Sequence, residues 1–292
     1  MIKNALVTDL DNTLFDWVNI WHQSFSAMMD EVLEVTGFPA DDLYSEVSIV
    51  HTRHGTSEYS FLLEEVPSLV EFCNGRPVVE VFSKAIDRYR DERRRHLKLY
   101  PNVAETLLSI KGRGALIVGY TESMAFYSNY RIRRLGLDGV LDYVFCPADH
   151  KIPNNISPSD IRKYPSEKYK LRYTEQHYTP EGVLKPSPEV LADILADLNI
   201  KKDQAVYVGD TLMKDIAMAN DSGVDSVLAE YGHAQSRDQY DLLKKVTHWT
   251  KEDVAREALV NSREDVVPQY RLKETFAELL QHFEFSDFIE VT

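Results

Sequence analysis

The sequence predicts an α/β protein built on a parallel sheet. Short apolar runs of strand length alternate with longer segments in which apolar residues recur every three or four positions. Because helices rather than tight turns separate the strands, the pattern is typical of βαβ units. The 292 residues suit one large domain or two modest ones, and a hydrophobic content of 43% is ample for a core.

Five apolar runs are candidates for buried strands, because each has the length of a strand and is bounded by polar or turn residues. In chain order they are residues 5–8, 115–120, 143–146, 205–209 and 225–229. Val266 and Val267 are a candidate for a further short strand.

Residues 17–97, between the first two predicted strands, read as nearly all helix. Apolar residues from Trp17 to Leu33 recur at helical spacing, which predicts an amphipathic helix. Residues 57–72 and 78–97 are also expected to be helical. We therefore expect a helical insert between the first strand and the rest of the sheet.

Further helices are expected after the insert, at residues 100–110, 123–135, 187–198, 212–220, 235–262 and 273–283. Residues 147–182 interrupt the alternation with several prolines and little periodicity. This stretch is too long for an ordinary connection and shows no sheet-forming pattern, so we expect an elaborated loop. Its tyrosines, lysines and arginines also fit phosphate or nucleic-acid binding, but the net charge of the chain favours a folded surface flap.

A net charge of −14 argues against a nucleic-acid-binding protein, which needs a basic surface. An anionic substrate is still possible, because a bound divalent cation inverts the local field. Two cysteines, Cys73 and Cys146, provide neither a disulfide framework nor metal-ligand spacing. With no signal-peptide pattern and no apolar stretch of membrane-spanning length, we expect a soluble cytoplasmic protein without a membrane partner.

Polar residues gather where the predicted strands end. They are Asp9, Asp11 and Thr13 after the first strand, Thr121 after the second, Lys185 before the helix that precedes the fourth, and Asp210 and Asp215 after the fourth. In open α/β sheets, ligands bind at the carboxyl ends of the strands. Carboxylates placed so close together repel one another unless a cation lies between them.

In this order, the residues resemble the motifs of the haloacid dehalogenase-like (HAD) hydrolase superfamily. Four motifs carry the resemblance: Asp9-Leu10-Asp11-Asn12-Thr13, Thr121, Lys185-Pro186, and Gly209-Asp210 to Asp215. The resemblance covers residues 4–16, 98–146 and 183–229, and it is greatest to phosphatases of the phosphoglycolate phosphatase-like type. It implies a Rossmann-like sheet with helices on both faces, formed by residues 1–16 and 98–292 with the insertion at 147–182. Residues 17–97 would form a helical C1-type cap.

The resemblance implies an Mg²⁺-dependent phosphomonoesterase that forms an aspartyl-phosphate. Asp9 would be the nucleophile, and Asp11 would be the general acid and then the general base. The implied Mg²⁺ ligands are Asp9, the backbone carbonyl of Asp11, and Asp210, with Asp215 bound directly or through water. Thr121 would donate a hydrogen bond to the phosphoryl group, and Lys185 would pair with Asp9 and that group.

Each of these residues also has a purely structural interpretation. Lys185 fits a surface lysine before a helix, Thr121 fits a helix cap, and Asp215 fits an acid in a first helical turn, where the dipole favours it. The four motifs in register favour the catalytic interpretation. Glu122 and Lys214 stand where many relatives have Asn, which points to altered substrate contacts.

The polar segment 51–57 has two interpretations. Arg53 and His54 are candidate substrate-binding residues, because they offer cationic groups to an anion. Alternatively the segment is a surface loop in which Ser57 caps a helix beginning at Glu58. Both interpretations stay open at this point.

A helical cap indicates an enclosed site and a small soluble phosphate ester, such as phosphoglycolate, a sugar phosphate or a nucleoside monophosphate. A phosphotransferase or phosphomutase with the same intermediate is an alternative. So is a non-catalytic regulatory protein, although that class normally lacks Asp9 or Asp11. Dehalogenation is disfavoured, because Asp11 supplies an acid that carbon–halogen cleavage does not need. The sequence does not indicate an oligomeric state.

Overall fold

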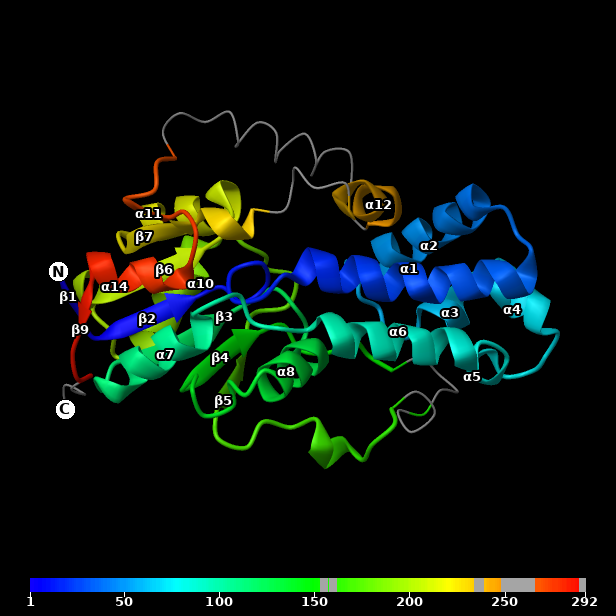
Figure 1. Cartoon of the computed structure of the whole chain (residues 1–292), viewed down its shortest axis with the longest axis horizontal. Helices are drawn as coiled ribbons and strands as arrows, with labels where there is room; N and C mark the ends of the chain where they lie inside the picture. Colours follow the sequence, from blue (N-terminus) through cyan, green and yellow to red (C-terminus); the bar gives the residue numbers. More distant parts are fainter. Residues whose placement is uncertain (153–156, 158–161, 234–238, 248–265, 289–292) are drawn as a thin grey trace.

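The computed structural model describes residues 1–152, 157, 162–233, 239–247 and 266–288. A seven-stranded sheet forms its centre, and every neighbouring pair of strands is parallel (Figure 1). Along the sheet the strands are β5 (Glu175–Tyr178), β4 (Tyr143–Cys146), β3 (Leu116–Tyr120), β2 (Ala5–Thr8), β6 (Ala205–Gly209), β7 (Asp225–Ala229) and β8 (Tyr270–Leu272). The predicted α/β class and the five predicted strands are confirmed.

Two strands differ from the sequence-based expectation. β5 lies within the segment expected to be an elaborated loop, and β8 lies at Tyr270–Leu272 instead of at Val266 and Val267. Both are edge strands of the sheet. The residues of β5 are exposed or half-buried, so this strand lacks the apolar run that marks a buried strand.

Helices cover both faces of the sheet, as expected. Side chains alternate along β2, so that Leu6 packs with helices on one face while Ala5 and Val7 pack with helices on the other. The first face carries α7 (Val103–Gly112), α8 (Ala125–Arg134), and the short turns η5 (Phe276–Glu278) and α14 (Leu279–His282). The second face carries α10 (Pro188–Asp197) and α11 (Ala217–Ser222).

Short elements complete this part of the molecule. A two-stranded parallel sheet joins β1 (Ile2–Lys3) to β9 (Glu284–Phe285). Single turns are η1 (Ser166–Lys168), η2 (Lys202–Gln204), the π-helical η3 (Leu212–Ile216) and η4 (Glu230–Gly232). The helix expected over 273–283 begins only after Thr275, whose side chain and Glu278 form a capping box.

The insert between β2 and β3 is helical, as expected, and its first helix matches the prediction, but the helices after residue 57 are shorter than predicted. The helices of the insert are α1 (Trp17–Thr36), α2 (Ala40–His54), α3 (Leu62–Glu65), α4 (Pro67–Cys73), α5 (Val78–Val81) and α6 (Ser83–His96). The helix expected over 57–72 is divided at Pro67, which has no N–H and starts α4. Ser57 does not cap a helix, because it is buried and its hydroxyl contacts that of Thr247.

The insert has its own apolar core, which includes Trp21, Phe25 and Val47. One later helix also packs into this core: α12 (Gln239–Val246) lies against α1 and α2 and contributes Tyr240, Leu243 and Val246 (Figure 1). α12 falls within the helix expected over 235–262, and the remainder of that expectation lies outside the described residues.

Two chain crossings connect the insert to the sheet. They run side by side, because Phe15 forms an antiparallel bridge with Leu99 and the N–H of Tyr100 donates to the carbonyl of Leu14 at 2.9 Å. Within the described residues, no helix combines the length and apolar character needed to cross a membrane.

We predict that Leu243→Ala destabilises the protein by about 2–4 kcal/mol, because it leaves a cavity where α12 meets the insert. Leu243 is fully buried, whereas its neighbour Leu242 is only partly buried. Urea unfolding followed by circular dichroism measures the change, and Leu242→Ala is the matched control. Equal effects of the two variants would contradict the packing of α12 described above.

Candidate functional site

The site begins at the carboxyl end of β2. The N–H of Asp9 donates to the carbonyl of Val208 at 2.8 Å, so the hydrogen-bond ladder between β2 and β6 continues one residue past the strand. This bond fixes the backbone from which the Asp9 side chain projects. Thr13 turns back and donates its hydroxyl to Asp9 Oδ2 at 3.2 Å. Asp9 is therefore buried and held at the centre of the sheet edge.

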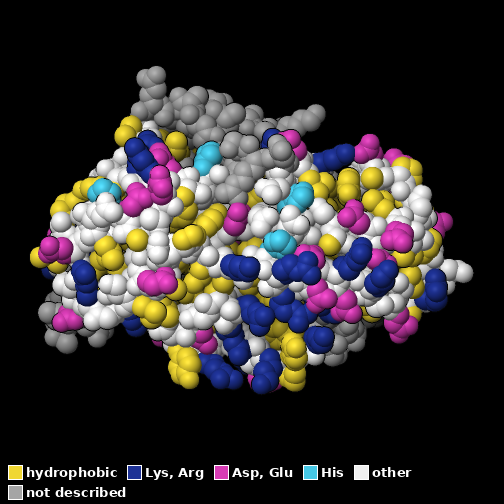
Figure 2. Space-filling model, in the orientation of Figure 1, with side chains coloured by type: hydrophobic (Ala, Val, Ile, Leu, Met, Phe, Trp, Pro, Cys, Tyr) yellow, Lys and Arg dark blue, Asp and Glu magenta, His cyan; other side chains and the backbone are white. Residues whose placement is uncertain are grey.

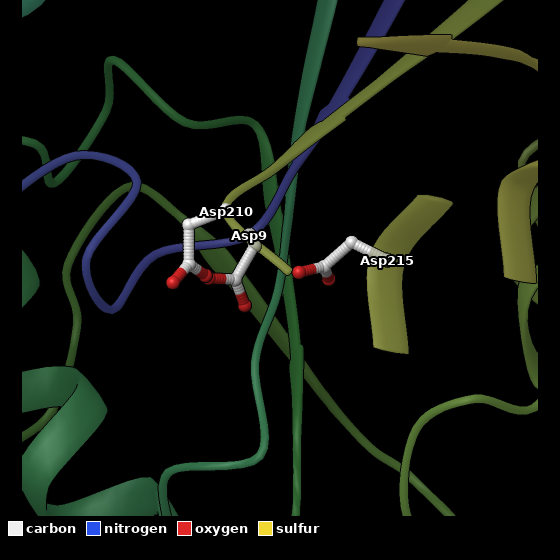
Figure 3. Close-up of side chains that lie close together, drawn as sticks. All are labelled: Asp9, Asp210 and Asp215. Carbon is white, nitrogen blue, oxygen red and sulfur yellow. The ribbon is translucent and has the colours of Figure 1, made fainter. Parts of the chain in front are cut away.

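The neighbouring strand β6 places two more carboxylates beside Asp9. Asp210 follows the strand directly, and Asp215 projects from the π-helical turn η3. One carboxylate oxygen from each of the three residues lies within 4.8 Å of the other two, and all three residues are buried (Figure 3). Gly209 permits this approach, because a Cβ there would lie 2.3 Å from Cγ of Asp215.

Lys185 joins these carboxylates. Its Nζ lies 2.6 Å from Asp9 Oδ1 and 3.0 Å from Asp215 Oδ1, and its side chain is 2% exposed. Asp215 is bound on its other oxygen by the N–H and hydroxyl of Thr211, at 3.1 and 2.7 Å. The hydroxyl of Tyr207 donates to Asp215 Oδ1 at 2.9 Å. Asp215 is thus saturated with donors.

The protonation of the cluster follows from burial and these contacts. Burial raises the pKa of Asp9 to about 7, although Lys185 opposes the shift. Burial, with the charges of Asp215 and Asp9, raises the pKa of Asp210 well above its ordinary value. Burial also opposes ionisation of Asp215, but Lys185 and Thr211 outweigh it and lower the pKa of Asp215.

The carboxylates fit a divalent cation. Three buried acids stand against one lysine, so a fully ionised cluster has excess negative charge that water does not screen. Among the described residues, no side chain or backbone N–H donates a hydrogen bond to Asp210, whose oxygens are therefore available as ligands. A small set of carboxylate oxygens is what Mg²⁺ takes from proteins.

Asp11 lies next to this cluster, on the side of β3 and α8. Its Oδ2 accepts hydrogen bonds from the hydroxyls of Thr121, at 3.0 Å, and Ser123, at 2.7 Å. Its Oδ1 is 3.1 Å from Nη1 of Arg131. Thr121 also accepts the N–H of Ser123 at 3.0 Å, so its hydroxyl is directed at Asp11 in this structure.

Arg131 is a site residue that the sequence did not single out. Its side chain is 2% exposed, and it bridges Asp11 to Glu58, a residue of the helical insert. Burial disfavours the charged guanidinium, but Glu58 and Asp11 outweigh burial and raise the pKa of Arg131. The only signal in the sequence is helical spacing, because Arg131 lies four residues after the buried Tyr127 of α8.

The structure brings six predicted residues to one edge of the sheet as two neighbouring sets, which we call the connected group: Asp11 with Thr121, and Asp9 with Lys185, Asp210 and Asp215. It places Arg53 and His54 elsewhere, at the end of α2, and neither contacts a carboxylate of this group. Arg53 and His54 pair with Glu65, at 3.2 and 2.7 Å. The ring of His54 also stacks on Tyr59, with centroids 3.7 Å apart.

Glu122 and Lys214 form an ion pair of 2.5 Å at the edge of the site. The other oxygen of Glu122 accepts the backbone N–H of Lys185 at 2.9 Å. Glu122 therefore ties the end of β3 to the segment that carries Lys185.

The chain is similar to proteins of one known hydrolase family. The family model described as haloacid dehalogenase-like hydrolase matches residues 3–223. Two relatives are named glyceraldehyde 3-phosphate phosphatase. That of Methanopyrus kandleri is 26% identical and covers 80% of this chain and 87% of its own, and that of Pyrococcus furiosus is 24% identical and covers 77% and 79%.

A solved structure with a similar fold is the 2-haloacid dehalogenase of Pseudomonas syringae pv. tomato DC3000. It aligns with 96% of this chain and 97% of its own at 19% identity and a TM-score of 0.54. The family model covers the helical insert and all six residues of the connected group. The chain therefore belongs to the haloacid dehalogenase-like hydrolase family.

Proposed function

We propose that this enzyme is an Mg²⁺-dependent phosphatase that hydrolyses a small phosphate ester through an aspartyl-phosphate on Asp9. The observation that carries the proposal is the contact of Lys185 with Asp9 and Asp215, beside Asp210, to which no described residue donates a hydrogen bond. A nucleophile, a fixed cation and a set of carboxylate oxygens that suit a metal ion are thereby within reach of one phosphoryl group.

In the first step a carboxylate oxygen of Asp9 attacks phosphorus, and the bond from phosphorus to the ester oxygen breaks. Asp11 donates a proton to that leaving oxygen. In the second step water attacks phosphorus, Asp11 takes a proton from the water, and the bond to Asp9 breaks. Lys185 stabilises the charge on the equatorial phosphoryl oxygens in both steps.

The proposed ligands of Mg²⁺ are Asp9, Asp210 and the backbone carbonyl of Asp11. When bound, the ion supplies the positive charge that lets an anionic nucleophile approach an anionic phosphoryl group. Because donors already occupy both oxygens of Asp215, we assign Asp215 to holding Lys185 and to contacting the ion through water.

For the substrate, the names of the two relatives favour a triose phosphate such as glyceraldehyde 3-phosphate. Phosphoglycolate is a second candidate of similar size and charge. We propose that residues 17–97 form the cap over a core of residues 1–16 and 98–292, with the insertion at 147–182. Arg53 and His54 remain candidates for substrate contact in that cap.

We predict that Asp9→Asn lowers kcat for phosphate release by at least about 10³-fold, because an amide does not form the intermediate. Purified protein is assayed with Mg²⁺ against glyceraldehyde 3-phosphate, phosphoglycolate and an aryl phosphate. Asp16→Asn, at the first helix cap, is a matched change outside the connected group. Retained activity in Asp9→Asn would contradict the assignment of the nucleophile.

We predict that a chelator abolishes activity and that Mg²⁺ restores it. Asp210→Asn should raise the Mg²⁺ concentration for half-maximal activity roughly tenfold or more, because it removes a direct ligand. Asp215→Asn should mainly lower kcat, because it removes the partner of Lys185. Mg²⁺ titrations of both variants separate the two roles, and identical shifts would refute the distinction.

Arg131 is proposed as a positioning residue for Asp11. We predict that Arg131→Lys lowers kcat roughly tenfold with little change in KM, because one ammonium replaces a guanidinium that reaches both Asp11 and Glu58. Arg133→Lys on the same helix is the control. A change in KM alone would show that Arg131 acts on binding instead.

A further inference from the structure

A cavity of about 410 Å³ lies where the helical insert meets α8 and residues 162–169. Its volume lies within the range of small-molecule pockets. Asp9, Asp11, Asp210, Asp215 and Lys185 do not line it. Glu58 does line it, and the ion pair of Glu58 with Arg131 stands between the cavity and Asp11. The cavity is thus separate from the connected group, whose proposed role is catalysis and which we call the catalytic group below.

The inner wall of the cavity is apolar and rich in aromatic rings. The buried side chains in this wall include Trp21, Phe25, Leu62, Leu63 and Tyr127. Trp21 and Phe25 stack with centroids 4.9 Å apart, and the indole N–H of Trp21 already donates to the carbonyl of Ser57. Trp21 and Phe25 therefore offer contact area and no free donor to a ligand, which suits an apolar or aromatic group.

The outer part of the cavity is cationic. Eight lysines and arginines line the cavity against two glutamates, although the whole chain carries a net charge of −14. Five of the eight come from α6 and α8, namely Arg90, Arg93, Arg94, Arg133 and Arg134. Figure 2 shows Lys and Arg side chains gathered at the centre of this face, over α6 and α8.

Several of these cations lack a carboxylate partner in the described part of the chain. Arg93 lies over the ring of Tyr130, with 4.2 Å from the guanidinium carbon to the centroid, and its Nε is buried without a hydrogen bond. Arg134 and Lys168 make no ion pair with a described residue. Of the two glutamates, Glu58 is neutralised by Arg131, and burial raises the pKa of Glu64 to about 7. Arg90 and Arg94 pair with Asp87 and Asp91, so the charge available to a ligand is that of Arg93, Arg134 and Lys168.

From this combination we infer that the cavity binds a small amphipathic anion, with an aromatic or other apolar body against the inner wall and its anionic head on the arginines of α6 and α8. The two halves of such a ligand match the two halves of the lining. This inference does not depend on the proposed phosphatase activity, because it concerns residues outside the catalytic group.

Calorimetric titration of the full chain with naphthalene-2-sulfonate tests the inference. This probe has the required ring and head but is not a phosphate ester, so the enzyme does not hydrolyse it. We expect one site per chain, with Kd at least tenfold lower than for either of two control compounds. Naphthalene-2-methanol has the aromatic ring without the anionic head, and inorganic sulfate is an anion without the ring. Absence of binding, or equal binding of the uncharged alcohol, would overturn the inference.

A charge-reversed pair of variants locates the site. Arg94→Glu with Arg134→Glu should raise Kd at least tenfold, whereas Arg95→Glu with Arg113→Glu changes the net charge equally without touching the lining. Arg94 and Arg95 are adjacent on α6, and each pairs with the acid three residues earlier. If both double variants raised the Kd for the sulfonate equally, the proposed location of the site would be refuted.

Two further experiments test whether the probe binds at the catalytic group instead and whether the cationic face binds a lipid surface. Inorganic phosphate with Mg²⁺ should not displace the sulfonate, and displacement would instead assign the probe to the catalytic group. Sedimentation with phosphatidylglycerol vesicles should leave the protein in solution. Capture by vesicles without binding of the free sulfonate would show that the cationic face serves a lipid surface instead of a small molecule.

Discussion

Lys185 touches Asp9 and Asp215 at once, and the arrangement of the sheet edge depends on this shared contact. Three carboxylates from β2, β6 and η3 would repel one another in a buried space if no cation stood among them. The lysine relieves part of that repulsion and leaves Asp210 without a partner in the described chain. Stability and the proposed metal binding are therefore coupled here, because the negative charge that remains after folding is the charge that a divalent cation would neutralise.

The sequence predicted the centre of the fold well, since buried parallel strands carry a strong local signal. Leu6 and Val7, Val206 and Val208, and Val227 and Leu228 belong to apolar runs of strand length. The carboxyl ends of such strands meet at one edge, so Asp9 and Asp210 could be placed together without a structure. β5 and the break at Pro67 were missed, because an edge strand is held by backbone hydrogen bonds and short helices by tertiary packing.

Arg131 shows why the rest of the site could not be predicted. It stands in a run with Arg133 and Arg134, and composition does not tell which of the three is buried. Its role depends on Glu58 and Asp11, which lie 73 and 120 positions away in the sequence. The pairing of Arg53 and His54 with Glu65 was equally hidden from the sequence. It depends on how α2 and α3 pack together within the insert.

The packing of α12 against the insert adds a connection between the insert and the sheet. The crossings at Phe15 and Leu99 run side by side, and alone they would form a single hinge line. The chain crosses again from β7 to α12 and returns to β8, so the insert is also held through Tyr240, Leu243 and Val246. A swing of the insert about the hinge must either carry α12 along as a strap or expose these three side chains to water. Any such movement that left α12 behind would therefore cost the burial of these three side chains.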